Sequence, residues 1–238
     1  MPILVAHRGF RSKLGENRMI DFENALQVCR AVEFDIRLTK DNQVIIFHDN
    51  TFFRIANNKS EVSALDYQEI INLEFFKNNP IATPPLFSDF IEKLSKNYQM
   101  INVEIKEVES QKYTKQQLIV LFAAIEKLAK TTTAEIIVSS FNQDLLNEIV
   151  KRIIFPIKKG YLFENKNDFS KKYAKKFDYL HPAVTVALDL EMITKLKTIK
   201  KPLNIWTFND NETAIKINKI YAKQVAGYIS DNPNLLWE

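Results

Sequence analysis

The sequence predicts an α/β protein folded as a TIM (β/α)8 barrel. Short runs rich in β-branched and aromatic residues alternate with helical patterns along the whole chain. This alternation favours parallel strands, because each crossover between parallel strands needs a helix or a long connection. Eight such runs within 238 residues fit a TIM barrel. A doubly wound open sheet is the alternative, but its marker, a Gly-rich first turn between strand and helix, is missing.

The elements of the first half follow from local pattern. Residues 3–7, 31–38 and 43–48 are apolar and rich in Val, Ile and Phe, which is typical of strands. Residues 19–29 and 88–97 place apolar side chains at helical spacing. The two kinds of segment therefore alternate as a barrel requires, apart from the extra strand at 43–48.

The second half continues the alternation. Residues 100–106 and 135–141 read as strands, and residues 114–130 and 142–152 read as helices. Four more short strands follow, with helical segments between them, at 158–163, 177–182, 202–208 and 227–231. The eight expected barrel strands contain His7, Glu33, Glu104, Ser139, Tyr161, His181, Trp206 and Ser230.

The strand at 43–48 is joined to the strand at 31–38 by only a few turn residues. No helix fits in this connection, so the strand must return antiparallel. If the loop centres on Asp41 and Asn42, the numbers of opposite residues sum to 83, and His48 faces Asp35. The hairpin is therefore expected to carry a histidine back to the acidic residues of the preceding strand.

Residues 50–85 break the rhythm of strands and helices. The segment is longer than an ordinary connection in a barrel and has polar and aromatic clusters of its own. We interpret it as a small insertion within a single catalytic domain that spans residues 1–238. Its stretch at 72–76, NLEFF, either contributes to an apolar rim beside the pocket or forms the insertion's own core.

Composition and charge exclude several classes of protein. A net charge of +4 is mild and argues against a nucleic-acid partner, although weak contact with an anionic membrane surface stays open. The longest apolar stretch, 118–125, is far shorter than the roughly 20 residues that a spanning helix needs. No secretory signal precedes the first strand, so we expect a cytoplasmic protein. The oligomeric state cannot be inferred from these patterns.

The single cysteine, Cys29, excludes an intramolecular disulfide. It lies at the end of a helical pattern, where we expect a buried structural thiol. The third histidine, His181, precedes a proline, has no acidic residue near it in sequence, and is expected to be structural. Ser139 and Ser140 lack the GxSxG setting of a nucleophile and are expected to line the barrel.

Three carboxylates form the candidate metal site. Glu33 and Asp35 are two residues apart on one strand, so their side chains point to the same face. Glu104 and Lys106 repeat this spacing on the next barrel strand. Carboxylates inside a barrel are costly unless a positive charge lies between them. Glu33, Asp35 and Glu104 together make an all-oxygen site for one hard divalent cation, Mg²⁺ or Ca²⁺.

The neighbouring residues indicate the chemistry. His7 ends the first strand and His48 is returned by the hairpin, and two histidines near a metal suit general acid and general base roles. Arg8 and Lys106 supply positive charge for an anionic ligand. This combination predicts cleavage of a phosphodiester, in which one histidine activates the nucleophile and the other protonates the leaving alkoxide.

The same residues lie in motifs that resemble a known family. AHRG, EN, EFDIRLTKD, HD, VEIK, SSF, WTFND and SDNP occur in the order seen in glycerophosphodiester phosphodiesterases, from His7 to Pro233. The resemblance implies a TIM barrel with a small insertion and a divalent metal. It also implies hydrolysis of glycerophosphodiesters, such as glycerophosphocholine, to glycerol 3-phosphate and an alcohol.

The resemblance also assigns roles to individual residues. His7 and His48 match the acid/base pair, and Arg8 and Lys106 match the cations on the phosphate side. Trp206 is similar to an aromatic residue near the substrate pocket. The metal ligands of the family match Glu33, Asp35 and Glu104.

The sequence departs from the family in one place near the site. The family usually has Pro-Glu-Asn-Thr after the first strand, whereas this chain has Gly15, Glu16, Asn17 and Arg18. The changes at Gly15 and Arg18 flank the entrance of the pocket and bear on substrate affinity.

Two further acidic residues have expected roles near the site, and two alternative functions stay open. Asp49 is expected to orient the turn or His48, and Asp231 to hydrogen-bond at the rim of the pocket. One alternative function is a non-catalytic relative that binds phosphodiesters. The other is a lysophospholipase D-like enzyme, which an exposed apolar rim beside the pocket would favour.

Overall fold

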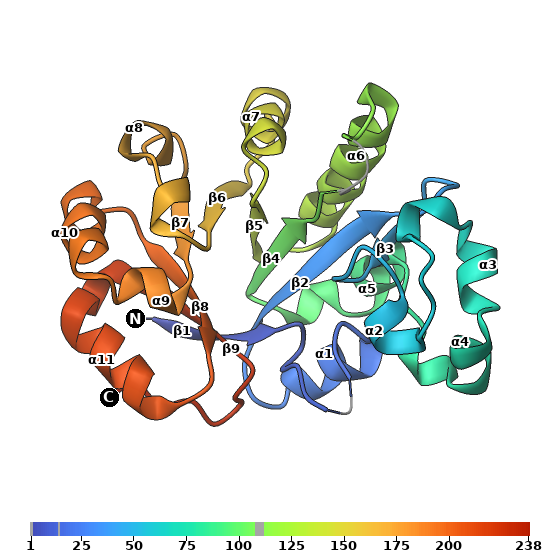
Figure 1. The fold of residues 1–238 in the computed structure, drawn as a ribbon, viewed down its shortest axis with the longest axis horizontal. Helices are drawn as coiled ribbons and strands as arrows, with labels where there is room; N and C mark the ends of the chain where they lie inside the picture. The colour runs from blue at the N-terminus through green and yellow to red at the C-terminus, as the bar shows by residue number, and fades with distance from the viewer. Residues whose placement is uncertain (1, 14, 108–111) are drawn as a thin grey trace.

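The computed structural model describes residues 2–13, 15–107 and 112–238. Among them, eight parallel strands close into a barrel with helices around it, and a ninth strand pairs antiparallel with the second (Figure 1). The predicted TIM barrel is confirmed, and each expected strand contains its expected residue. The strands are β1 (Ile3–His7), β2 (Ala31–Leu38), β3 (Val44–Ile46), β4 (Met100–Ile105), β5 (Glu135–Ser140), β6 (Lys158–Phe163), β7 (Tyr179–Pro182), β8 (Leu203–Phe208) and β9 (Val225–Ser230).

The helices follow the expected pattern, with ends shifted by a few residues. The α-helices are α1 (Met19–Ala25), α2 (Phe53–Ala56), α3 (Tyr67–Ile71), α4 (Glu74–Asn78), α5 (Phe87–Lys93), α6 (Lys115–Thr131), α7 (Gln143–Arg152), α8 (Lys171–Ala174), α9 (Val184–Ala187), α10 (Leu190–Ile199) and α11 (Asn211–Tyr221). The 3₁₀ helices are η1 (Val62–Ala64), η2 (Pro80–Ala82), η3 (Ser95–Asn97), η4 (Lys166–Asp168) and η5 (Ala222–Gln224). In the described part of the chain, none of these helices has the length and apolar character that would let it span a bilayer.

The barrel closes where β1 meets both its neighbours. β1 pairs with β9 along four rungs, from Ile3 opposite Gly227 to Ala6 opposite Ser230. On its other side it pairs with β2 only at its end, where His7 lies opposite Glu33. The closure of the barrel therefore brings a candidate catalytic residue next to a candidate metal ligand.

The hairpin between β2 and β3 has a register different from the one predicted. Ile36 lies opposite Ile46 and Leu38 opposite Val44, so opposite numbers sum to 82 and the predicted sum of 83 is wrong. The connection is a three-residue loop whose last residue, Asn42, has a left-handed φ of +59°. Such a loop adds one residue to the two-residue turn on which the prediction rested. Phe47, and not His48, therefore lies opposite Asp35, and its N–H donates to Asp35 O at 2.9 Å.

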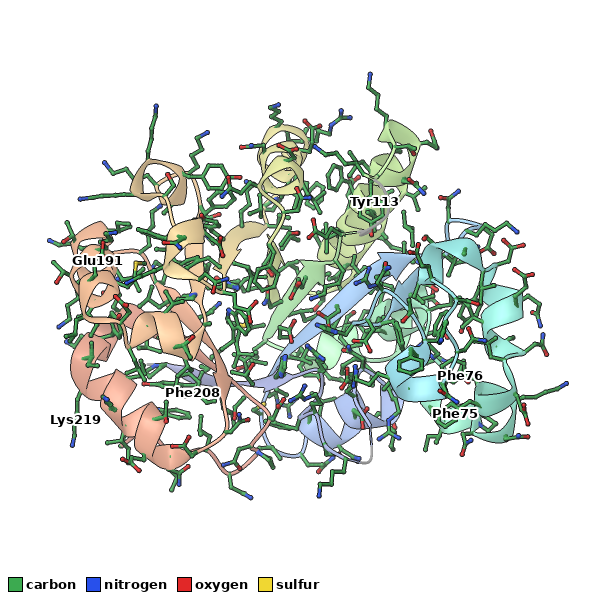
Figure 2. All side chains as sticks on the ribbon, viewed as in Figure 1. Phe75, Phe76, Tyr113, Glu191, Phe208 and Lys219 are labelled. Atoms are coloured by element: carbon green, nitrogen blue, oxygen red, sulfur yellow. The ribbon has the colours of Figure 1, made fainter. Side chains whose placement is uncertain are left out.

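Residues 50–85 pack on the outer side of the hairpin, beside β2 and β3 (Figure 1). They share a separate apolar cluster with β3, whose buried members are Ile45, Phe47, Phe52, Val62, Ile70 and Phe76. Phe76 is buried in this cluster, whereas the neighbouring ring of Phe75 is 36% exposed (Figure 2). The stretch at 72–76 therefore serves mainly as the insertion's own core, with Phe75 at the surface.

Candidate active site

The three predicted metal ligands come together at the carboxyl ends of β2 and β4. Asp35 lies opposite Glu104 in the strand register, and Glu33 lies one pleat below Asp35 on the same face. One carboxylate oxygen from each of the three residues lies within 4.8 Å of the others. All three side chains are buried. The barrel thus concentrates negative charge at one point of its interior.

Two cations partly neutralise this cluster. Lys106 Nζ lies 2.6 Å from Glu104 Oε1 and 3.5 Å from Asp35 Oδ1. Arg8 Nε lies 3.3 Å from Asp35 Oδ2, and Asn17 Nδ2 donates to the same oxygen at 2.9 Å. Burial raises the pKa of Asp35, but Arg8 and Lys106 lower it by more, so the pKa lies below its usual range. Asp35 is therefore ionised at neutral pH.

Glu33 has no comparable partner. Its Oε2 atom is buried without a hydrogen bond, and the nearest basic atom is His7 Nε2 at 3.9 Å. Burial and the charges of Asp35 and Glu104 raise the pKa of Glu33 well above its usual value. A buried carboxylate of this kind needs added positive charge to stay ionised. The donor set of three carboxylates, in which one oxygen of Glu33 and one of Asp35 accept no hydrogen bond, fits a hard divalent cation.

The first histidine is held by the last barrel strand. His7 Nδ1 lies 2.6 Å from Asp231 Oδ1, and Arg11 Nη2 lies 3.1 Å from the other oxygen of Asp231. Burial lowers the pKa of His7, and the hydrogen bond to Asp231 offsets part of this shift. With Nδ1 engaged, His7 turns its Nε2 toward Glu33 and the carboxylate cluster.

The second histidine has a carboxylate partner of the same kind. His48 Nδ1 lies 2.7 Å from Asp49 Oδ1, and Arg54 Nε donates to Asp49 Oδ2 at 2.7 Å. Burial raises the pKa of Asp49, but its bonds to His48 and Arg54 lower it by more, below the usual range. The site therefore contains two His–Asp pairs, one on each side of the carboxylate cluster.

Arg54 connects the two sides of the site and was not predicted from the sequence. Besides Asp49, it donates to both carboxylate oxygens of Glu16, at 2.9 and 2.7 Å. Glu16 in turn accepts from Arg8 Nη1 at 2.9 Å. One side chain of α2, in the insertion, thus bonds to the partner of His48 and to the partner of Arg8.

The backbone after β1 is shaped to present Arg8. Arg8 and Asn17 have left-handed φ values of +51° and +57°, a conformation that is costly for arginine and tolerated by asparagine. The Arg8 N–H donates to Glu33 O at 2.8 Å, and the Asn17 N–H donates to Arg8 O at 2.9 Å. These bonds hold the strained segment against β2, so the Arg8 side chain stays over the carboxylates.

Gly15 and Arg18, the two residues at which the sequence departs from the family, lie against each other. Arg18 turns its side chain onto α1, where its Nε and Nη2 donate to Asp21 at 2.8 and 2.7 Å. A Cβ atom at Gly15 would lie 2.3 Å from Arg18 Cζ, and Gly15 has a φ of +151°. The φ of +151° is what favours glycine at position 15, and a Cβ there would in addition displace the flexible end of the Arg18 side chain. Neither change places a group on the carboxylate cluster.

A cavity of about 370 Å³ adjoins the cluster and is the candidate substrate pocket. Five of the residues predicted to bind the metal, the phosphate or the protons line it, namely His7, Arg8, Glu33, Glu104 and His48. Trp206 and Lys106 also line it. A neighbouring hollow of about 490 Å³ shares His48, Glu104 and Lys106 and is bordered by Arg54 and Phe53 of the insertion.

The remaining polar residues have structural positions. His181 is fully buried in the barrel interior, where its Nε2 lies 3.3 Å from Asn204 Nδ2 and burial lowers its pKa to about 3. Ser139 Oγ donates to Asn102 Oδ1 inside the barrel, whereas Ser140, whose side chain points to the opposite face of β5, donates to Ile105 O. Cys29 is only half-buried, and burial raises the pKa of its thiol.

Comparison with known proteins gives one family. The sequence model of the glycerophosphoryl diester phosphodiesterase family matches residues 7–235. An uncharacterized protein of Mycoplasma genitalium is 27% identical over 238 residues, covering 93% of this chain and 93% of that protein. A glycerophosphodiester phosphodiesterase of Caldanaerobacter subterraneus is 28% identical and covers 68% of this chain and 67% of its own length.

The solved structures show the same fold. A phosphodiesterase of Oleispira antarctica, solved in complex with the product sn-glycerol-3-phosphate, superposes with a TM-score of 0.78. It is 23% identical to this chain and covers 98% of it, with 94% of its own chain matched. At this identity, the likeness supports the barrel architecture.

Proposed function

Since the chain belongs to the glycerophosphoryl diester phosphodiesterase family and is a phosphoric diester hydrolase, we propose that it hydrolyses glycerophosphodiesters with a divalent cation and histidine acid/base catalysis. The products are glycerol 3-phosphate and an alcohol. The observation that carries the proposal is the buried carboxylate cluster between two His–Asp pairs in one pocket.

Glu33, Asp35 and Glu104 would hold one Mg²⁺ or Ca²⁺ ion. Glu33 Oε2 and Asp35 Oδ1 support this assignment, because they accept no hydrogen bond, whereas buried carboxylate oxygens usually do. When bound, the cation supplies Lewis-acid polarisation of the phosphoryl group. Arg8 and Lys106 lie beside the same carboxylates and bind the non-bridging phosphate oxygens by charge.

His7 and His48 move the protons. An aspartate on Nδ1 favours the tautomer with the proton on Nδ1, which leaves Nε2 free to accept or donate a proton. One histidine takes the proton of the nucleophile, and the other gives a proton to the leaving alkoxide. Asp231 and Asp49 orient the rings and stabilise the imidazolium that forms in each case. Trp206 forms an aromatic wall of the substrate pocket.

A lysophospholipase D-like activity is the second candidate. Phe53 of α2 is 53% exposed and borders the hollow next to the pocket, and Phe75 of α4 is 36% exposed nearby. Exposed aromatic side chains at a pocket rim suit an acyl chain or a lipid surface. A non-catalytic relative is disfavoured because both His–Asp pairs and the carboxylate cluster are intact.

The test is release of glycerol 3-phosphate from glycerophosphocholine by the purified protein, with Mg²⁺ and with Ca²⁺. We expect release that disappears with EDTA and with His48→Ala. Choline release from lysophosphatidylcholine, measured beside this assay, separates the two candidate activities. Release that survives EDTA refutes the metal requirement, and release that survives His48→Ala refutes the role of this histidine. A folded protein without release with either metal favours the non-catalytic relative.

A further inference from the structure

One wall of the pocket, opposite His7, has a different character from the rest. It consists of Phe141, Leu162, Glu164 and Trp206, at the carboxyl ends of β5, β6 and β8. Three of these side chains are apolar, and one is a carboxylate. This wall has no role in the proton and metal chemistry described above.

Glu164 belongs to this wall because of the strand period. Leu162 and Glu164 both line the cavity, whereas Tyr161 and Phe163 point outward. The two outward rings pack against Phe177 and Phe169, with centroids 5.5 and 5.2 Å apart. Glu164 therefore continues the inward-facing row of β6, one step of about 6.6 Å beyond Leu162 along the chain.

Glu164 also differs from the other charged residues of the pocket in its partners. The cations Arg8, Arg11 and Lys106 each pair with a carboxylate. Glu164 is exposed, and among the residues that the structure describes it makes no ion pair or hydrogen bond. An unpaired carboxylate facing a pocket attracts a cation from solution.

The aromatic part of the wall is held rigidly. Trp206 Nε1 donates to His181 O at 2.9 Å, which fixes the indole. The ring of Phe141 meets it edge to face at a centroid distance of 5.5 Å. Since the indole N–H is already engaged and Lys106 Nζ lies over the Phe141 ring, 5.5 Å from its centroid, the four wall side chains offer one carboxylate, the indole ring and no free donor. Such a surface suits an organic cation better than a hydroxyl-rich group.

We propose that Glu164, Trp206 and Phe141 form a subsite for a cationic, amine-bearing head group on the leaving alcohol of the substrate. The ammonium of a choline or ethanolamine head group would lie on the indole face and near the Glu164 carboxylate. The proposal rests on the proposed function, because it places the phosphate of the same diester at the carboxylate cluster. Glu164 and Glu104 line one cavity, so one ligand spans them.

The test compares head groups in steady-state hydrolysis. The substrates are glycerophosphocholine and glycerophosphoethanolamine against glycerophosphoglycerol and glycerophosphoinositol, whose head groups carry no positive charge. The wild-type enzyme is expected to have the higher kcat/KM for the cationic pair. Glu164→Gln should lower kcat/KM for that pair by about three- to fivefold, mainly through KM, because the carboxylate is open to solvent. It should leave the neutral pair unchanged.

Two further variants sharpen the comparison. Glu126→Gln, on the outer face of α6, should change neither pair of substrates. Glu107→Gln removes a carboxylate from the neighbouring hollow, where Asn142 already donates to it at 2.7 Å. The proposal is overturned if the preference for cationic over neutral head groups is lost in Glu107→Gln and kept in Glu164→Gln. It is also overturned if Glu164→Gln lowers kcat/KM equally for cationic and neutral head groups.

A binding measurement separates this proposal from the proposed function. The chain has two tryptophans, so Trp237→Phe leaves Trp206 as the only indole. Choline titrated into this variant should change the Trp206 fluorescence saturably. Adding Glu164→Gln should weaken the apparent affinity for choline by about three- to fivefold. If the protein binds choline but hydrolyses none of the diesters, the proposed activity is refuted and the subsite is not. Hydrolysis without choline binding refutes the subsite alone.

Discussion

Replacing Arg54 should uncouple the two halves of the active site. Arg54→Met removes the hydrogen bonds to Asp49 and Glu16 but keeps a side chain of similar length on α2. The Arg54 side chain is 45% exposed, so each carboxylate pairing contributes only about 0.5–1 kcal/mol. Glu16 retains its bond to Arg8, so no buried charge is left alone. We expect a total loss of about 1–2 kcal/mol in the free energy of unfolding.

The effect on catalysis should be larger than on substrate binding. Without Arg54, Asp49 keeps only its bond to His48, so the ring is oriented by one hydrogen bond to a partly exposed carboxylate. We expect kcat to fall about tenfold, which corresponds to about 1.4 kcal/mol of barrier. KM should change little, because Arg8 and Lys106, which we propose to bind the phosphate, are unchanged. Arg54→Lys should recover only part of kcat, since one ammonium cannot bridge two carboxylates as a guanidinium does.

Arg152→Met is the matched control. Arg152 on α7 is 41% exposed and pairs with Glu148 at 2.6 Å, far from the pocket in the fold. Steady-state kinetics on glycerophosphocholine and urea unfolding should be measured on all variants. Arg152→Met should leave kcat unchanged. An Arg54→Met enzyme that matches Arg152→Met in kcat, or that changes only KM, would refute the positioning role of Arg54.

Three other perturbations have definite expected outcomes. Glu33→Gln should raise the Tm of the metal-free protein by about 2–4 °C, because it relieves repulsion with Asp35 and Glu104. It should also abolish the Tm increase on adding Ca²⁺ or Mg²⁺, and a retained increase would place the cation elsewhere. Gly15→Ala should cost about 1–3 kcal/mol both with Arg18 and with Arg18→Thr, because the φ of +151° is unfavourable for alanine whatever fills the space, and a negligible cost in urea unfolding would contradict this. The pKa of His181 is lowered to about 3, so below pH 6.5 the unfolded chain binds a proton that the folded protein does not. The contribution of His181 to stability is complete above pH 6.5 and falls by about 1.4 kcal/mol per pH unit below it. His181→Gln should therefore flatten the pH dependence of the free energy of unfolding between pH 6.5 and 3. Parallel pH dependences for the variant and the wild type would contradict this.

The strands and the carboxylate cluster could be predicted because they depend on local periodicity. Alternate positions on a strand share a face, and neighbouring parallel strands end at the same edge, so Glu33, Asp35 and Glu104 were expected to converge. The hairpin register was not predictable in the same way. It depends on whether two or three residues form the loop, and the left-handed φ of Asn42 decides this.

The partners of the catalytic side chains were the hardest to foresee. Asp231 was expected only at the pocket rim, yet it bonds directly to His7, which is 224 positions away in the sequence. Arg54 lies in an insertion without strand periodicity, and nothing local indicates that it reaches both Asp49 and Glu16. Long polar side chains on irregular segments are directed by tertiary packing, which the sequence pattern does not reveal.

The pairing of β1 with β9 has a consequence during protein synthesis. The ribosome makes the three candidate metal ligands and the two candidate catalytic histidines within the first half of the chain, well before Asp231. Until β9 has emerged, β1 lacks its four-rung partner and His7 lacks its aspartate. A nascent chain that lacks β9 therefore carries nearly every candidate site residue without an assembled site. We expect hydrolysis only when the last strand is in place, so a chain truncated before β9 should be inactive.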